Sequence, residues 1–280
     1  MTSFIKGLYI VSTPIGNLDD ITLRGLDILK KSDIILCEDT RRSLKLLNHF
    51  NIKKKLVSYH KFNEKKELIK IIEYLNEGKI LALISDAGTP TISDPGNLLI
   101  KECIARKINL IPVPGVSSVT AATSISGFND KFIFYGFLPK KVKELEKVLN
   151  SMKNLEFSIV FFIPGIKINF YLDYFKIFFS DRNILIAREI TKIHETFYRE
   201  KIKEIKNFKS ALKGELTIVI SNKYNKSKII DNSEIIYQAK KYLKKYSLKD
   251  VVELISKKEK IPKNEVYKIC LELKKNEKIS

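Results

Sequence analysis

Residues that can do chemistry concentrate in four short loops, and each loop follows a run of apolar residues. The loops span Ser12–Leu18, Glu38–Arg42, Ser85–Gly96 and Pro112–Ser118. In open sheets of parallel strands, ligands bind outside the carboxyl ends of the strands, where such loops meet. The spacing therefore predicts one polar cleft to which all four loops contribute.

The loop Glu38–Arg42 carries two adjacent carboxylates, Glu38 and Asp39, and two adjacent guanidinium groups, Arg41 and Arg42. Carboxylates at a strand end can orient a hydroxyl or accept its proton, and Arg41 and Arg42 can clamp a phosphate with paired hydrogen bonds. A structural interpretation is equally strong, because Asp39 and Thr40 are common caps at the start of a helix. Both interpretations stay open for this loop.

The loop Ser85–Gly96 contains two glycines and two prolines, so its backbone is stiff and can also approach a ligand closely. Asp86 is placed to bind ligand hydroxyls, although such a loop can also be no more than a tight turn. The loop Ser12–Leu18, with its proline, glycine and asparagine, has the same two interpretations. The loop Pro112–Ser118 ends where a helix is expected, and free backbone N–H groups there suit a carboxylate or a ribose oxygen.

Several common catalytic motifs are absent from the sequence. No two glycines are separated by one residue, and no Gly-Lys is followed by Ser or Thr, so the dinucleotide fingerprint and the P-loop are missing. His-Glu-x-x-His and Gly-x-Ser-x-Gly are missing as well. The three cysteines and three histidines are scattered without metal-ligand spacing. We therefore expect no metal site, no disulfide framework and no hydrolase.

The net charge of +19 and the pI near 9.6 favour a polyanionic partner, because Lys and Arg that neutralise phosphates release counterions. Compositional drift toward Lys explains the same charge, since only seven of the 51 basic residues are Arg. The chain has neither an apolar run of membrane-spanning length nor the features of a signal peptide. A cytoplasmic location without a membrane partner is expected.

The elements that must position the loops alternate between strand and helix, which predicts a mostly parallel sheet. The predicted strands are Leu8–Val11, Ile34–Cys37, Ile80–Ile84 and Leu110–Val113. Thr22, Thr40 and Asn63 are expected to cap helices that end near Lys31, His49 and Leu75, and another helix is expected over Gly96–Lys107. The run Lys53–Lys55 is interpreted as solvated surface.

The pattern restarts after about residue 125, which indicates a second α/β domain. Its predicted strands are Phe132–Phe137, Ser158–Phe162, Ile184–Arg188, Glu195–Tyr198 and Leu216–Ile220, and the short connection between the third and fourth predicts an antiparallel pair in a mixed sheet. Two amphipathic helices, Leu248–Ser256 and Asn264–Leu273, flank a turn with Ile261-Pro262 and have a helix-turn-helix outline. We therefore predict α/β domains over 1–125 and 126–224 and a helical tail over 225–280.

The sequence resembles that of the tetrapyrrole methylase superfamily and, within it, a branch of ribosomal RNA methyltransferases that acts on the small subunit. Blocks in both halves of the chain carry the resemblance, in order and spacing. They are Leu8–Leu18, Glu38–Arg41, Ser85–Pro90, Asp94–Gly96, Gly136–Pro139, Ala187–Lys192 and Gly214–Leu216. The resemblance covers nearly the whole chain, including the terminal helices.

The resemblance implies two α/β domains of tetrapyrrole-methylase type, with S-adenosylmethionine in the cleft between them, and a homodimer. It implies methyl transfer to a cytidine 2′-hydroxyl of small-subunit (16S) ribosomal RNA, either free or in the 30S particle. The cofactor-binding residues that it implies are Pro14, Gly16, Asp86, Gly88, Thr89, Pro114, Gly115, Ser117 and Ser118. Lys192 and Glu189 are expected to face the same cleft, Lys192 as a catalytic candidate, although without the resemblance a surface ion pair of little energetic value is the commoner explanation.

The activated methyl donor leaves the protein mainly the task of aligning an acceptor oxygen and excluding water. A ribose hydroxyl is a weak acid, so a base can assist, and Asp39 or Glu38 is the candidate. Asp39 is the preferred hypothesis because it adjoins the expected cleft. Arg41 and Arg42 are the residues expected to bind RNA.

Two positions depart from the pattern of this branch. Tyr135 stands where an acidic residue is usual, and Phe161–Lys167 replaces a segment that normally offers polar groups. Two other functions therefore stay open. One is methylation of a small tetrapyrrole, against which the basic charge and the terminal helices weigh, and the other is an RNA-binding protein of the same fold without turnover.

Overall fold

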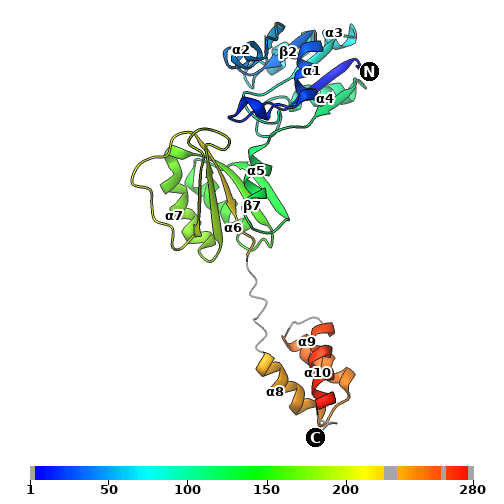
Figure 1. Cartoon of the computed structure of the whole chain (residues 1–280), viewed down its shortest axis with the longest axis vertical. Helices are drawn as coiled ribbons and strands as arrows, with labels where there is room; N and C mark the ends of the chain where they lie inside the picture. The colour runs from blue at the N-terminus through cyan, green and yellow to red at the C-terminus, as the bar shows by residue number, and fades with distance from the viewer. Residues whose placement is uncertain (1–3, 224–231, 260–262, 277–280) are drawn as a thin grey trace. The chain divides into compact units, whose positions relative to one another are not determined.

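The first half of the chain builds a five-stranded sheet in the order β3-β2-β4-β1-β5, and all its neighbouring strands are parallel (Figure 1, blue to cyan). The computed structural model describes residues 4–223, 232–259 and 263–276, which form two compact units divided between Lys223 and Tyr224. The strands are β1 Gly7–Val11, β2 Ile34–Cys37, β3 Lys55–Ser58, β4 Ile80–Leu83 and β5 Leu110–Val113. The helices are η1 Leu18–Asp20, α1 Leu23–Lys31, α2 Thr40–His49, α3 Glu64–Asn76, α4 Asn97–Ala105 and α5 Ser118–Ser124.

Alternating side chains of the first sheet enter two separate cores, because successive residues of a strand point to opposite faces. On β1, Tyr9 packs with α1 and α2, whereas Leu8 packs on the other face with α3 and α4. Both faces of the sheet are therefore covered, and ligands can reach its strands only at their ends.

The strands predicted for this half are confirmed, but one edge strand was not predicted and one cap prediction is wrong. The additional strand, β3, begins at Lys55, whose side chain is exposed, so the interpretation of the lysine run as solvated surface holds. Asp39, not Thr40, caps α2, because the Asp39 side chain accepts a hydrogen bond from the Arg41 amide. Thr22 caps α1 as predicted and accepts from the Gly25 amide.

The second half builds a five-stranded sheet in the order β6-β7-β10-β8-β9. Only β6 and β7 are parallel, so the predicted mixed sheet with an antiparallel β8–β9 pair is confirmed. The strands are β6 Phe132–Phe137, β7 Ser158–Pro164, β8 Asn183–Arg188, β9 Thr196–Lys201 and β10 Glu215–Ile220. The helices are α6 Val142–Met152, η2 Gly165–Lys167 and α7 Ile168–Phe179.

The two faces of this second sheet have different covers. Helices α6 and α7 pack on one face around buried aromatic residues such as Phe161 and Phe175. The short helix α5 packs on the other face, where Val119 and Ala122 contact Val160 and Val219. The two-sheet α/β class predicted from the sequence is thus confirmed, and the boundary near residue 125 stays a prediction.

The second unit forms three helices in its described part, α8 Asn232–Leu243, α9 Leu248–Glu259 and α10 Lys263–Asn276. Val251, Ile255, Val266 and Cys270 are buried between them. The predicted pair corresponds to α9 and α10, and α8 was not predicted. The predicted turn at Ile261-Pro262 lies outside the described residues. None of the described helices is long and apolar enough to cross a membrane.

Candidate active site

A cleft of about 650 Å³ opens at the carboxyl ends of the first sheet and is also lined by the second sheet. The parallel order of the strands explains why loops that are distant in sequence meet there. From the first half, the lining comprises Ile15, Glu38, Arg42, Asp86, Ala87, Gly88, Thr89, Ile92, Ser93, Asp94, Ser117 and Ser118. From the second half, it comprises Phe137, Phe162, Ala187, Glu189, Ile190, Lys192, Gly214, Glu215 and Thr217.

The loops after β1, β4 and β5 are joined to one another. Thr13 and Gly88 exchange two backbone hydrogen bonds, each with an N to O distance of 2.9 Å. The Ser12 and Thr89 hydroxyls are 3.0 Å apart, and Thr89 also donates to the Val116 carbonyl at 3.2 Å. These contacts fix one wall of the cleft in place before any ligand arrives, which lowers the entropic cost of binding.

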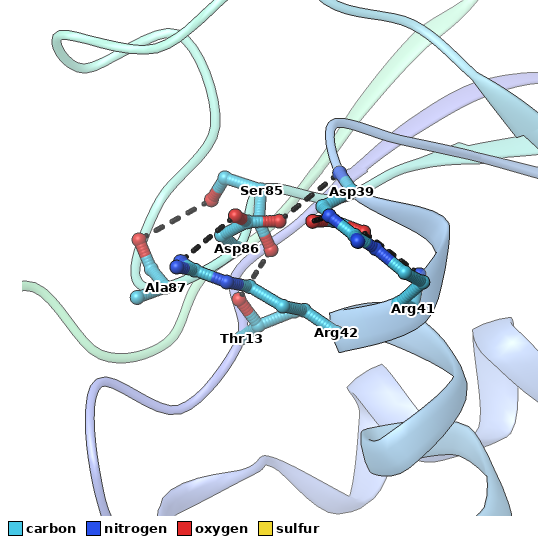
Figure 2. Close-up of polar contacts among 7 residues, drawn as sticks. All are labelled: Thr13, Asp39, Arg41, Arg42, Ser85, Asp86 and Ala87. Carbon is cyan, nitrogen blue, oxygen red and sulfur yellow. Dashed lines mark hydrogen bonds and ion pairs between the residues drawn. The ribbon is translucent and has the colours of Figure 1, made fainter.

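Figure 2 shows how the predicted charged residues divide between this wall and the start of α2. Arg42 reaches across to Asp86, with 3.1 Å between Nη1 and Oδ2, and the Asp39 amide donates to the other oxygen of Asp86 at 3.2 Å. Arg41 instead folds back on Asp39, with 2.8 Å between Nη2 and Oδ2. Arg42 and Asp86 therefore line the cleft, whereas Arg41 and Asp39 do not.

The surroundings of Asp39 hold its carboxyl in the ionised form. The Arg41 guanidinium and the Arg41 amide lower its pKa to about 2. Glu38 differs, because burial and the neighbouring charge of Asp86 raise its pKa. Of the two carboxylates on consecutive residues, only Glu38 faces the cleft.

Asp94 is a cleft residue that the sequence interpretation missed. Burial, followed by the charge of Glu38, raises its pKa to about 6, and the charges of Asp86 and Glu215 add to the effect. Its loop has left-handed backbone at Thr91 and Ser93, with φ of 68° and 70°. Such strain in residues other than glycine persists where surrounding structure enforces it, commonly at functional sites. The Asp-Pro-Gly sequence was interpreted as a turn, and that turn carries the carboxylate.

The second half contributes a strained turn of its own. Glu189 and Thr191 have left-handed backbone, with φ of 53° and 67°. Lys192 pairs with Glu189 at 3.0 Å between Nζ and Oε1, and both side chains line the cleft. Thr191 accepts a hydrogen bond from the Asn17 amide at 3.0 Å, so this turn contacts the loop after β1.

The structure brings eight of the predicted site residues to the cleft surface, and the other six do not line it. Those on the surface are Glu38, Arg42, Asp86, Gly88, Thr89, Ser117, Ser118 and Lys192. Those not on the surface are Pro14, Gly16, Asp39, Arg41, Pro114 and Gly115. Two of the latter pack closely: a β-carbon on Gly115 would lie 2.8 Å from Cβ of Ser12, and one on Gly16 would overlap Lys192.

The two unusual segments occupy different places. Tyr135 lies at an irregularity of β6, between Phe134 and Gly136, and is partly exposed. Phe162 lines the cleft, but the next residue, Ile163, is buried in the core on the other face. The cleft therefore gains an apolar wall from Phe162 and Phe137, whose rings are in edge contact with centroids 5.4 Å apart.

Comparison with known proteins agrees with this architecture. The sequence model of the family "Tetrapyrrole (Corrin/Porphyrin) Methylases" matches residues 7–206. A solved structure, uroporphyrin-III C-methyltransferase from Thermus thermophilus complexed with S-adenyl homocysteine, superposes with a TM-score of 0.56. The match covers 77% of this chain and 97% of that one at 14% identity, which is a likeness of fold alone.

Sequence relatives are much closer. A protein of Mesomycoplasma conjunctivae named "Ribosomal RNA small subunit methyltransferase I" is 46% identical over 79% of this chain and 94% of its own length. A protein of the same name from Buchnera aphidicola is 40% identical over 97% of this chain and 99% of its own length. The chain belongs to the tetrapyrrole methylase family and, within it, to the ribosomal RNA small subunit methyltransferase I group.

Proposed function

We propose that this chain is an S-adenosylmethionine-dependent methyltransferase that methylates the 2′-hydroxyl of a cytidine in small-subunit ribosomal RNA. The observation that carries the proposal is the cleft of about 650 Å³, which the preformed loops of the first sheet and the strained turn of the second line together. The names of relatives aligned to most of the chain support ribosomal RNA as the substrate.

The charge of the lining fits this cofactor. The cleft has five acidic residues, Glu38, Asp86, Asp94, Glu189 and Glu215, and two basic ones, Arg42 and Lys192, so its formal charge is negative. A sulfonium nucleoside carries positive charge at the reacting sulfur, and a surplus of carboxylates attracts it. The apolar side chains of Ile15, Ile92, Phe137 and Phe162 offer a surface for a purine.

The proposed cofactor contacts use the wall already described. Asp86, Thr89, Ser117 and Ser118 offer polar groups to a ribose and to an amino-acid tail. Gly88, which has left-handed backbone with φ of 82°, keeps the chain close to the ligand. Pro14, Gly16, Pro114 and Gly115 belong to the same loops but do not line the cleft, so their proposed role is to shape the pocket.

The cofactor, when bound, supplies a methyl group that is already activated for transfer. The protein has to hold an acceptor oxygen in line with that methyl at roughly 3 Å and to exclude water. Arg42 and Lys192 are cations at the cleft, placed to hold phosphates of the RNA. Each is already positioned by a carboxylate, Asp86 and Glu189 respectively.

Three carboxylates are candidates for the base that receives the hydroxyl proton. Asp39 was preferred from the sequence, but it caps α2 and pairs with Arg41. Glu38 and Asp94 both line the cleft, and burial together with the charge of Glu38 raises the pKa of Asp94 to about 6. A base is most effective when its pKa approaches the operating pH. We therefore assign the proton to Asp94.

The step balances without another reactant. The hydroxyl proton passes to the Asp94 carboxylate while the hydroxyl oxygen forms the new bond to carbon. The carbon–sulfur bond breaks, and its electron pair stays on sulfur, which loses its positive charge. The products are a 2′-O-methyl ribose, a neutral thioether and a protonated Asp94, which then releases its proton to water.

The proposed setting follows from the same substrate. The partner is small-subunit ribosomal RNA, free or in the 30S particle, in the cytoplasm. The proposed active form is a homodimer, as the family resemblance implies. Velocity sedimentation of the purified protein measures its oligomeric state directly.

Methyl transfer from labelled S-adenosylmethionine tests the function. Purified protein is offered small-subunit RNA, 30S particles and, as the competing acceptor, a porphyrinoid precursor. We expect label in the RNA or the particle, at a cytidine whose 3′ phosphodiester becomes resistant to alkali. Label in the porphyrinoid, or no transfer although calorimetry shows cofactor binding, would contradict the proposal.

A further inference from the structure

Phe62 is exposed over 94% of its surface, an unusual position for a large apolar side chain. It lies in the turn between β3 and the first residue of α3, Glu64. Single exposed apolar residues are common on protein surfaces and need no explanation by themselves. The surroundings of Phe62 therefore decide whether it has a role.

Hydrogen bonds hold the turn that carries Phe62. The Phe62 amide donates to Nδ1 of His60 at 3.2 Å, and the His60 amide donates to Oδ1 of Asn63 at 2.8 Å. The Asn63 side chain also donates to the Ser58 carbonyl at 2.9 Å. The His60 and Phe62 rings meet edge to face with centroids 6.1 Å apart. The ring is thus presented to solvent on a preorganised support.

This turn lies beside the cleft. Strand β3 is parallel to β2, and Ser58 is in register with Cys37, so both strands end at the same edge of the sheet. The Tyr59 amide donates to the Cys37 carbonyl at 2.8 Å, and the Ser58 hydroxyl reaches the Glu38 carbonyl at 3.4 Å. Glu38 lines the cleft, so the turn forms the adjoining part of its rim.

Exposed cations flank this part of the rim. Lys61 precedes Phe62, and Lys65 and Lys66 lie exposed in the first turn of α3. The same turn holds Glu64 and Glu67, which are only partly exposed, so the exposed charges nearest the ring are positive. On the neighbouring strand end, the Arg41 and Arg42 side chains are exposed over 87% and 70%. An aromatic ring among cations suits single-stranded nucleic acid, because bases stack on the ring and phosphates bind the cations.

We propose that Phe62, with Lys61, Lys65 and Lys66, forms a stacking platform for an unpaired base of the RNA substrate beside the methylated nucleotide. The inference rests on the proposed function and adds a contact that fixes the register of the RNA at the cleft. The exposed ring flanked by lysines favours a single-stranded polyanion as the occupant, because bases stack on the ring and phosphates bind the lysines.

A tryptophan reporter tests the platform directly, because the chain contains no tryptophan. Phe62→Trp places the only indole on the turn, and Ile177→Trp is the matched control. Ile177 is 67% exposed and belongs to α7, which packs on the face of the second sheet opposite α5. A single-stranded ribo-oligonucleotide should quench the emission of Phe62→Trp and leave that of Ile177→Trp unchanged. Equal responses of the two variants would overturn the proposal.

Kinetics give the second measurement. Loss of one stacked base by Phe62→Ala should raise KM for small-subunit RNA about tenfold with little change in kcat, and Phe62→Tyr should restore it. Cofactor affinity should not change, because Phe62 does not line the cleft. If Phe62→Ala leaves KM unchanged but alters sedimentation, the platform is a protein interface and the RNA assignment is wrong. If the wild type does not methylate RNA, the proposed function fails, and oligonucleotide quenching still decides the platform.

Discussion

The start of α2 and the loop before α4 both follow neighbouring strands of the first sheet, and both carry an aspartate in opposite surroundings. Asp39 at the start of α2 accepts hydrogen bonds from the amide and guanidinium of Arg41, and its pKa is about 2. Asp94 in the loop is half-buried near Glu38, Asp86 and Glu215, and its pKa is about 6.

The difference lies in the charge of the neighbours and in burial, because the two side chains are chemically identical. A cation beside Asp39 favours the ionised form, whereas desolvation and carboxylates around Asp94 disfavour it. One aspartate is thereby suited to structure and the other to proton transfer. Titratable groups whose surroundings separate their pKa values often mark such a division of roles.

The largest expected effect is on the single-turnover rate, which shows whether Asp94 or Asp39 acts as the base. Asp94→Asn should lower the single-turnover rate at pH 8 by at least about 100-fold, because it removes the proton acceptor and keeps the shape. Asp39→Asn should change that rate by less than about threefold, since Asn still caps α2. Rapid-quench measurement with saturating cofactor compares the two variants.

Stability provides the control for the Asp94 variant. Its folded pKa of about 6 lies above the ordinary value of 3.8, so at pH 8 the folded protein holds a charge that burial disfavours. Asp94→Asn should therefore raise Tm at pH 8 while activity falls. A lower Tm, or a rate equal to that of Asp39→Asn, would contradict the assignment of the base.

The next largest effect is expected in the pH dependence of the wild-type methyl-transfer rate. The base must be ionised, so the rate should fall as the pH decreases through about 6, the pKa of Asp94. For one titrating group, the rate at pH 5 should be about tenfold below its plateau above pH 7. A flat profile from pH 5 to 8 would mean that neither Asp94 nor another group with this pKa controls the step.

Glu38→Gln sharpens the comparison by removing the charge that contributes most, after burial, to the raised pKa of Asp94. The pKa of Asp94 should decrease, so the acidic limb of the rate profile should move to lower pH by about half a unit or more. Asp39→Asn is the matched control, because Asp39 is not among the main causes of the Asp94 shift. If both variants shift the acidic limb of the rate profile equally, the shift comes from the net charge of the protein and not from the interaction between Glu38 and Asp94.

Local patterns in the sequence were enough to predict most helices and strands of the fold. Ile34–Cys37 is an uninterrupted apolar run, and Leu110–Val113 is interrupted only by Pro112, which an edge strand tolerates. The observed β2 and β5 have the same limits. Strand β3 was missed because Lys55 and Ser58 leave only Leu56 and Val57 as an apolar signal, which is typical of a short edge strand.

The site was less predictable, because its properties depend on residues that only the fold brings together. Asp86 and Thr89 belong to a motif that is visible as a Gly- and Pro-rich loop. The raised pKa of Asp94 needs Glu38 and Glu215, which follow β2 and begin β10, and no local pattern connects those positions. Conversely, the position of Asp39 after a strand suggested a catalytic residue. Only the structure showed that its carboxylate forms an ion pair with Arg41.

The smallest expected effect concerns the structural role of Asp39. Asp39→Ala should lower Tm at pH 7 by a few degrees, because the Arg41 amide loses its acceptor, whereas Asp39→Asn should lower Tm by less, because Asn keeps the cap and loses only an exposed ion pair. The folded pKa of about 2 lies below the ordinary value of 3.8, so the contribution of the charge is complete above about pH 4 and disappears as the pH decreases through 2. The stability difference between wild type and Asp39→Asn should therefore narrow in that window, as thermal unfolding followed by circular dichroism can measure. Equal destabilisation by Asn and Ala at pH 7 would show that the negative charge, and not the cap, is what the start of α2 requires.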